Sequence, residues 1–127
     1  MIEVLPVDAF WEGNLAREGT YVVAFVADWC PFCREFLPEF SALDGGSAYR
    51  TAIADLSSAK NPLWDEMGIE VVPTLIVFRA GRALLRVDGI PGEGIPPHGL
   101  EQAEAVARGS PPDTPPRVSP FRSGQRP

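Results

Sequence analysis

The only two cysteines of this 127-residue chain stand three positions apart, at a point where one kind of secondary structure should give way to another. An apolar run, Tyr21–Val26, leads into them, and a segment with helical periodicity, Glu35–Leu43, leads away. Cys30 and Cys33 therefore lie at a strand-to-helix junction, where the free N–H groups of a helix N-terminus stabilise an anion. A Cys-x-x-Cys pair at such a junction predicts a redox dithiol.

The segments around the dithiol predict an α/β domain. Thr20–Val26 is apolar and β-branched without alternation, which is typical of a central strand covered on both faces. Strands and helices alternate as far as the third strand, which requires parallel pairing, and a final hairpin adds an antiparallel edge. We expect a central mixed β-sheet with helices on both faces. The expected strands are Ile2–Leu5, Thr20–Val26, Tyr49–Asp55, Val71–Phe78 and Ala83–Asp88; the expected helices are Ala9–Glu18, Glu35–Leu43, Asn61–Met67 and Leu100–Arg108.

Two details of the helices follow from particular residues. In the first helix Asp8 is the expected N-cap, and the apolar residues fall near helical spacing. Trp11, and Trp64 in the third helix, should be core or packing residues. Pro38 falls inside the helix that follows the dithiol and should kink it.

Composition divides the chain into a domain, residues 1–107, and a C-terminal tail, residues 108–127. An apolar fraction of 45% with 22% charged residues is typical of a globular domain. The tail holds six prolines and few apolar residues, which predicts disorder; the alternative is a partner-binding arm. The tail carries a net charge of +3 and the remainder −9, and so acidic a body argues against nucleic acid as the main partner.

The chain also carries signals about its environment. Its apolar runs are far shorter than the roughly 20 residues that span a bilayer, and its N-terminus shows no signal-peptide pattern. Both cysteines belong to the motif, so none is left for a structural disulfide, as in cytosolic redox proteins. We expect a cytoplasmic monomer that does not contact membranes.

Four spacings make this chain resemble the thioredoxin-like family over roughly residues 2–107. The first two are Trp29-Cys30-Pro31-Phe32-Cys33 after an apolar strand, and Pro38 eight residues after Cys30. The third is Val72-Pro73-Thr74, which is similar to the family's cis-proline loop, and the fourth is Gly81 with Gly89 around the last hairpin. The resemblance implies a thioredoxin-like fold and a thiol–disulfide oxidoreductase that reduces protein disulfides. It implies no bound cofactor, since the Cys30–Cys33 disulfide is itself the redox centre.

The physical chemistry of the junction suggests a role for each cysteine. Cys30 should cap the helix, where the N–H groups and the dipole favour a thiolate. Pro31 suits the first helical position, since its missing N–H costs nothing there. We expect Cys30, at the exposed end, to be the attacking nucleophile, and Cys33, one turn inward, to be the resolving thiol that breaks the mixed disulfide.

The resemblance further implies how a substrate is bound. Pro73 should follow a cis peptide bond, so that the backbone of Val72 pairs with an extended substrate strand beside the dithiol. Trp29 and Phe32 should supply apolar surface around the sulfur, and Gly89 belongs to the same expected substrate-binding set. Disulfide-bearing proteins and a recycling reductase are the implied partners.

The chain departs from the family at the residues that set its redox behaviour. Ala24 stands where thioredoxins usually carry a buried aspartate, which leaves Asp55 as a candidate proton acceptor only by elimination. The dipeptide Pro31-Phe32 is closer to those of glutaredoxins and disulfide oxidases, so the direction of electron flow is open.

Several alternatives therefore stand beside the reductase. One is a disulfide oxidase or isomerase, and another is a glutaredoxin-like thiol transferase. A redox-switched binding module is the alternative from a different class. A zinc site is not expected, because the chain has no second cysteine pair and a single histidine, His98.

Overall fold

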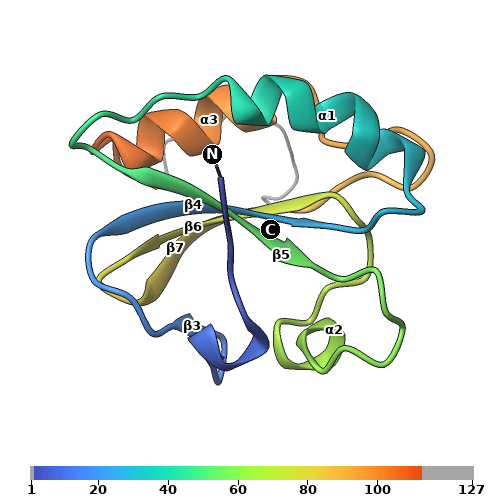
Figure 1. Ribbon diagram of the computed structural model, residues 1–127. Coiled ribbons are helices and arrows are strands. Elements are labelled where there is room, and N and C mark those ends of the chain that lie inside the picture. The colour runs from blue at the N-terminus through green and yellow to red at the C-terminus, as the bar shows by residue number, and fades with distance from the viewer. Residues whose placement is uncertain (1, 113–127) are drawn as a thin grey trace, which may run out of the picture.

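The computed structural model describes residues 2–112, and five of its strands form one twisted sheet in the order β1-β5-β4-β6-β7 (Figure 1). These strands are β1 (Glu3–Val4), β4 (Thr20–Val26), β5 (Arg50–Asp55), β6 (Thr74–Arg79) and β7 (Arg82–Val87). The pairs β1–β5 and β4–β5 are parallel, whereas β6 is antiparallel to both β4 and β7. The predicted mixed sheet with an antiparallel hairpin is confirmed.

Helices cover both faces of the sheet, as predicted. Within residues 2–112 the α-helices are α1 (Pro31–Ser41), α2 (Leu63–Glu66) and α3 (Gly99–Ala107). Figure 1 shows α1 and α3 together over one face, with α2 on the other. The predicted tail lies mostly outside the described residues, since it begins at residue 108 and the description ends at 112.

The predicted helix Ala9–Glu18 is wrong. In its place the chain forms a 3-10 turn, η1 (Val7–Ala9), followed by a hairpin of β2 (Phe10–Trp11) and β3 (Asn14–Leu15). The two residues between these strands, Glu12 and Gly13, both have positive φ (50° and 83°), as a tight two-residue hairpin turn requires.

The side chains of this hairpin alternate as they do in a strand. Phe10 and Leu15 are buried in the core, whereas Trp11 is 67% exposed. The prediction that Trp11 is a core or packing residue is therefore wrong. The apolar residues happen to fit both a helical and an alternating pattern, and the glycine in the turn decides between them.

The central strand β4 positions the dithiol. All its residues except the first are buried, and it is hydrogen-bonded to β5 on one side and β6 on the other. Val26, its last residue, lies opposite Asp55 at the end of β5, and Phe25 lies opposite Thr74 at the start of β6. The loop after β5 and the loop before β6 thus both open beside the start of α1.

Most other elements differ from expectation by one or two residues at their ends, and the differences next to the dithiol are larger. The helix after the dithiol begins at Pro31 and ends at Ser41, and it continues through Pro38. The fourth predicted strand, Val71–Phe78, begins only at Thr74, because the residues before it form the cis-proline loop, defined here as Val71–Thr74. The buried face of α1 consists of Cys33, Phe36 and Phe40, which are three and four residues apart.

Candidate active site

The first cysteine of the pair is the N-cap of α1. Cys30 has extended backbone dihedrals, and its Sγ accepts a hydrogen bond from the backbone N–H of Cys33 at 3.1 Å. Pro31 occupies the first helical position, where a missing N–H is not needed. The prediction that Cys30 caps the helix is confirmed. The sulfur therefore faces the positive end of the helix dipole and a free backbone donor.

Cys30 is less accessible than its place at the helix end predicts. It is 3% exposed, and its Sγ–H donates to the backbone carbonyl of Val72 at 3.5 Å. The expectation of an exposed sulfur is wrong for this state, because the cis-proline loop lies directly over it. Both cysteines are free thiols.

The second cysteine is fully buried in the first turn of α1. Burial raises the pKa of the Cys33 thiol to about 12, and the hydrogen bond with Cys30 raises this pKa too. The backbone of Ala27 and the charge of Arg34 lower the same pKa, but they do not offset burial. Cys33 is therefore a neutral thiol at physiological pH.

No carboxylate within residues 2–112 is hydrogen-bonded to Cys33. Ala24 is wholly buried in β4 and offers no polar atom in its side chain. The carboxylate of Asp55, the acceptor suggested by elimination, accepts hydrogen bonds from the N–H and hydroxyl of Ser57 instead, at 2.9 Å and 2.5 Å. The structure therefore gives Asp55 a role in the loop after β5.

The cis-proline loop is built as the sequence predicts. The peptide bond between Val72 and Pro73 is cis. Thr74, which is fully buried, donates its hydroxyl hydrogen to the Val71 carbonyl at 2.6 Å and accepts from the Gly89 N–H at 3.4 Å. Sequence reasoning missed this hydroxyl, although a threonine directly after the proline was the available signal.

Gly89 lies against the same loop. A Cβ at this position would stand 2.4 Å from the Pro73 carbonyl oxygen, closer than side-chain carbons come to backbone atoms. Gly89 thus packs on Pro73, next to the residue whose carbonyl contacts Cys30. The contact is a close backbone approach, and Gly89 is itself buried.

Trp29 forms the exposed border of the site. The side chain is 56% exposed, its Nε1–H donates to the Ser57 carbonyl at 2.9 Å, and its ring stacks on Trp64 with centroids 6.4 Å apart. The Ser57 hydroxyl also accepts from the Asp28 N–H at 2.8 Å. The prediction that Trp64 is a packing residue is confirmed. Ser57 holds Asp28 and Trp29 in place through these two hydrogen bonds.

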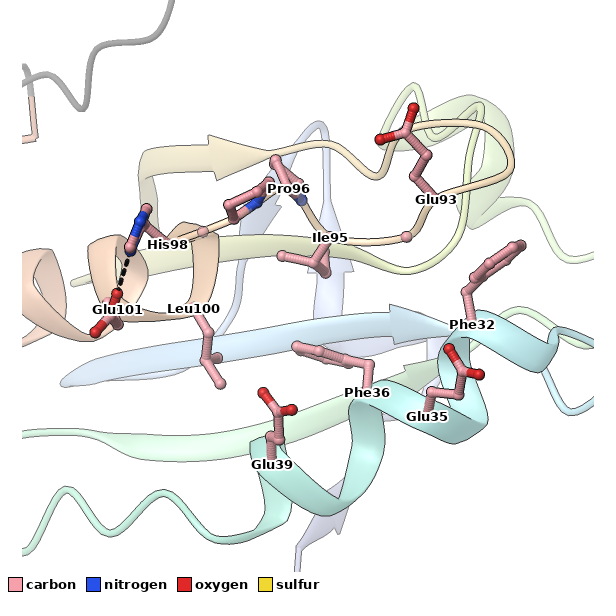
Figure 2. Close-up of a pocket in the computed structure, with 13 residues that line it drawn as sticks. Phe32, Glu35, Phe36, Glu39, Glu93, Ile95, Pro96, His98, Leu100 and Glu101 are labelled. Atoms are coloured by element: carbon pink, nitrogen blue, oxygen red, sulfur yellow. Dashed lines mark hydrogen bonds and ion pairs between the residues drawn. The ribbon is translucent and has the colours of Figure 1, made fainter.

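Phe32 lies on the opposite border. It is half-buried, and a Cβ at Gly94 would contact it at 3.4 Å, so the loop that follows β7 packs directly on this ring. Phe32 also forms one end of a cavity of about 460 Å³ between α1, this loop and the start of α3 (Figure 2). This cavity was not predicted, because it arises from the path of a loop rich in glycine and proline.

Two further observations concern metals and membranes. Within residues 2–112, no three side chains of His, Cys, Asp or Glu gather as a metal site would require, and His98 is hydrogen-bonded to Glu101 at 2.6 Å. Across the same residues, no helix has both the length and the apolar character needed to cross a bilayer.

Comparison with known proteins agrees with this geometry. The thioredoxin family model matches residues 3–95. The thioredoxin of Chlamydia muridarum is 29% identical over 91 residues, which cover 71% of this chain and 86% of that protein. The thioredoxin of Alicyclobacillus acidocaldarius is 30% identical over 83 residues, covering 65% of this chain and 79% of that protein.

Solved structures show the same fold. Thioredoxin f from spinach chloroplast superimposes with a TM-score of 0.66 at 23% identity, covering 84% of this chain and 86% of that one. The thioredoxin of Malassezia sympodialis gives a TM-score of 0.61 at 21% identity, with coverages of 85% and 91%.

Proposed function

This chain belongs to the thioredoxin family and carries the Cys-x-x-Cys pair of its protein-disulfide reductases, and we propose that Cys30 is its attacking thiol and Cys33 its resolving thiol. The observation that carries the proposal is the position of the Cys30 sulfur. It lies at the N-cap of α1, where it accepts the Cys33 N–H, and beside the carbonyl of Val72. A thiolate there has a backbone donor and a helix dipole to stabilise it.

In the first step the Cys30 thiolate attacks one sulfur of a substrate disulfide. A bond forms between Cys30 and that sulfur, the substrate S–S bond breaks, and the other substrate sulfur leaves as a thiolate. The N–H of Cys33 donates to the Cys30 sulfur before the attack.

In the second step Cys33 attacks the Cys30 sulfur within the mixed disulfide. Its pKa of about 12 means that the thiol must lose its proton as it attacks. The departing substrate thiolate ends as a thiol, the Cys30–Cys33 disulfide forms, and the substrate disulfide has been reduced to two thiols. Since Ala24 offers no carboxylate, we propose that the departing sulfur, or water at the site, takes this proton.

The substrate binds alongside the cis-proline loop. The backbone of Val72 pairs with an extended substrate strand, and Trp29, Pro73 and Gly89 form the surface around it. Support comes from the packing: the Val72 carbonyl already touches the Cys30 sulfur, and Trp29 is exposed at the border.

The remaining parts of the proposal concern the setting. The substrates are proteins with accessible disulfides, a partner reductase restores the dithiol, and the chain acts as a cytoplasmic monomer. Among the relatives, one thioredoxin of Schizosaccharomyces pombe is named mitochondrial, so members of the family act in more than one compartment.

Insulin reduction tests the proposed roles. The unsubstituted protein should reduce insulin disulfides with a dithiol reductant as electron source, and Cys30→Ser should fall to the uncatalysed background. Cys33→Ser should still attack and should accumulate a mixed disulfide with the substrate, visible by mass spectrometry. An active Cys30→Ser protein, or a mixed disulfide formed through Cys33, would contradict the assignment.

A disulfide oxidase is the second candidate, and the features that favour it are the Pro31-Phe32 dipeptide and Ala24. The reduction potential of the Cys30–Cys33 pair separates the two directions. A potential near about −270 mV indicates a reductant and one near about −120 mV an oxidant. A protein with neither activity that still binds a partner only in one redox state would instead be a redox-switched module.

A further inference from the structure

The cavity beside Phe32 is a groove whose lining begins at that residue and includes neither cysteine. Phe32 stands between the two cysteines, and the groove then follows the face of α1 that carries Glu35, Phe36 and Glu39 (Figure 2). Its other wall is the loop from Glu93 to His98 and the first turn of α3. The near end of the groove therefore lies two residues along the chain from Cys30.

The groove combines an apolar floor with an acidic rim. Phe36 is buried, and Ile95 and Leu100 are half-buried against the core. The lining includes four glutamates, Glu35, Glu39, Glu93 and Glu101, and no lysine or arginine.

Among residues 2–112, three of these glutamates have no side-chain partner. Glu101 accepts from His98 at 2.6 Å. Within residues 2–112 no salt bridge or side-chain hydrogen bond engages Glu35, Glu39 or Glu93, and all three are exposed. Three carboxylates around one groove, unpaired among the described residues, create a negative potential that attracts a cation and disfavours an anion.

We propose that this groove receives a basic stretch of the substrate, so that the protein prefers disulfides flanked by arginine or lysine. These two side chains match both features of the groove. Their aliphatic stems cover apolar surface, and their charged heads stay at a wet rim. The inference rests on the proposed reductase function and names the substrate class for the same site.

Helix geometry fixes where the basic residues should stand. Glu39 stands seven positions after Phe32, which is about 10 Å along the axis of α1. An extended substrate advances about 3.3 Å per residue. A basic side chain about two to four residues from the attacked cysteine therefore reaches the glutamates.

The second wall of the groove, formed by the loop from Glu93 to His98 and the first turn of α3, lies where the match to the family model ends. The match to the family model ends at residue 95, whereas the groove extends to Glu101. Pro96, His98 and Glu101 therefore lie beyond the matched region.

Two disulfide-bonded peptides of otherwise identical sequence test the proposal. One carries arginine at each of the positions two, three and four residues from the cysteine, and the other carries glutamine at these positions. Three exposed ion pairs at their ordinary strength predict a kcat/KM ratio of about five to ten in favour of the arginine peptide at low salt. The ratio should fall towards one at 1 M salt.

Substitutions in the groove should remove the preference. Glu35→Gln, Glu39→Gln and Glu93→Gln together should bring the ratio close to one. The control Asp8→Asn, Glu12→Gln and Glu18→Gln makes the same change in net charge on the η1 and β2–β3 side and should keep both the ratio and the activity. An unchanged ratio in the groove variant, or an equal loss in the control, would overturn the proposal.

Two more measurements distinguish the groove proposal from the reductase function, and a substrate in the groove from the chain's own C-terminus. Chemical-shift perturbation of the Glu35 and Glu39 amides by a cysteine-free arginine peptide reports binding without turnover. A protein that binds this peptide but has no reductase activity would contradict the proposed reductase function and leave the groove proposal standing. A protein that reduces both peptides equally and binds neither in the groove would contradict the groove proposal and leave the reductase function standing. In the full chain, a preference that emerges only after Arg117→Ser, Arg122→Ser and Arg126→Ser would assign the groove to the chain's own basic C-terminus and overturn the proposal.

Discussion

Against the Cys30 sulfur the chain is packed to close contact, whereas at Phe32, two residues further along, it borders an open groove. The closed side is the cis-proline loop with Gly89, where the Thr74 hydroxyl bonds to both neighbouring backbone segments. The open side is the groove at Phe32, whose rim carries carboxylates without partners among the described residues. The closed side fixes the position of the sulfur, and the open side can vary without disturbing it.

The difference follows from what each side must do. Attack on a disulfide needs the sulfur and the substrate backbone held in one geometry, and a mostly buried loop tied by the Thr74 hydroxyl supplies that. Choosing among substrates needs surface charge, which tolerates substitution because exposed side chains contribute little to stability. The comparison therefore predicts large effects on one side and small ones on the other.

The largest effect on stability should come from Gly89→Ala. The added Cβ would stand 2.4 Å from the Pro73 carbonyl oxygen, so backbone must move, and we expect a loss of about 3 kcal/mol in the free energy of unfolding together with lower activity. Urea denaturation measures the loss. Glu93→Ala, at the exposed groove rim, is the matched control and should stay within about 0.5 kcal/mol. Equal effects at the two positions would remove the contrast between the sides.

Thr74→Val should have the next largest effect. It keeps the shape of the side chain but removes the hydroxyl that bonds to the Val71 carbonyl and the Gly89 N–H, leaving buried polar atoms unpaired. We expect a loss of about 1–2 kcal/mol, measured in the same way. Thr74→Ser, which keeps the hydroxyl, should recover most of the loss. A valine variant as stable as the original would show that this hydroxyl does not hold the loop.

How much the sequence could predict differs along the chain for physical reasons. Strand Thr20–Val26 was predicted with its observed bounds, because an unbroken apolar β-branched run has few alternatives in a small domain. The cysteine pair, the cis bond before Pro73 and the N-cap followed from short spacings whose geometry is local. The helix Ala9–Glu18 failed because its apolar residues fit two periods, and the positive φ of Glu12 and Gly13 is visible only in the folded chain.

The groove could not be predicted, because it depends on contact between residues about sixty positions apart. Phe32, Glu35, Phe36 and Glu39 show helical spacing, which indicates a shared face but not what lies over it. Only the folded chain brings Gly94 against Phe32 and leaves Glu93 across from α1 (Figure 2).

The buried thiol of Cys33 should make stability depend on alkaline pH. Its pKa of about 12 in the folded protein lies above the value of about 8.5 in an unfolded chain. A folded-state pKa that is raised gives stability that is complete below the unfolded pKa and is lost as pH rises towards the folded pKa. Stability should therefore fall between about pH 8.5 and 12, by at most about 1.4 kcal/mol per pH unit for this one proton.

Cys30→Ser, which keeps only Cys33, isolates that proton. Its unfolding free energy should decline more steeply above pH 8.5 than that of Cys30→Ser/Cys33→Ser. The second variant titrates every other group, including Tyr49, whose pKa is also raised to about 12 by burial and by its hydrogen bond to Glu104. If the unfolding free energy falls equally steeply with pH in both variants, burial does not raise the pKa of Cys33.

The smallest effect, and the one that bears most directly on the open side, should come from Glu39→Gln. Glu35 and Glu39 are four residues apart on α1, and like charges at that spacing destabilise a helix by about 0.2–0.5 kcal/mol. Glu39 also lies in the last turn, where a negative charge opposes the helix dipole. Removing its charge should therefore raise the free energy of unfolding by about that amount at low salt, and 1 M salt should abolish the gain. Glu18→Gln, outside any helix, is the control and should change nothing.

A stability gain together with a weaker preference for basic substrates would mean that the groove keeps its charge at a cost to the stability of the fold. A surface charge that is only solvated would not require that cost. If Glu39→Gln instead lowers stability, its carboxylate already has a stabilising partner, and the open side is no longer a free acidic rim.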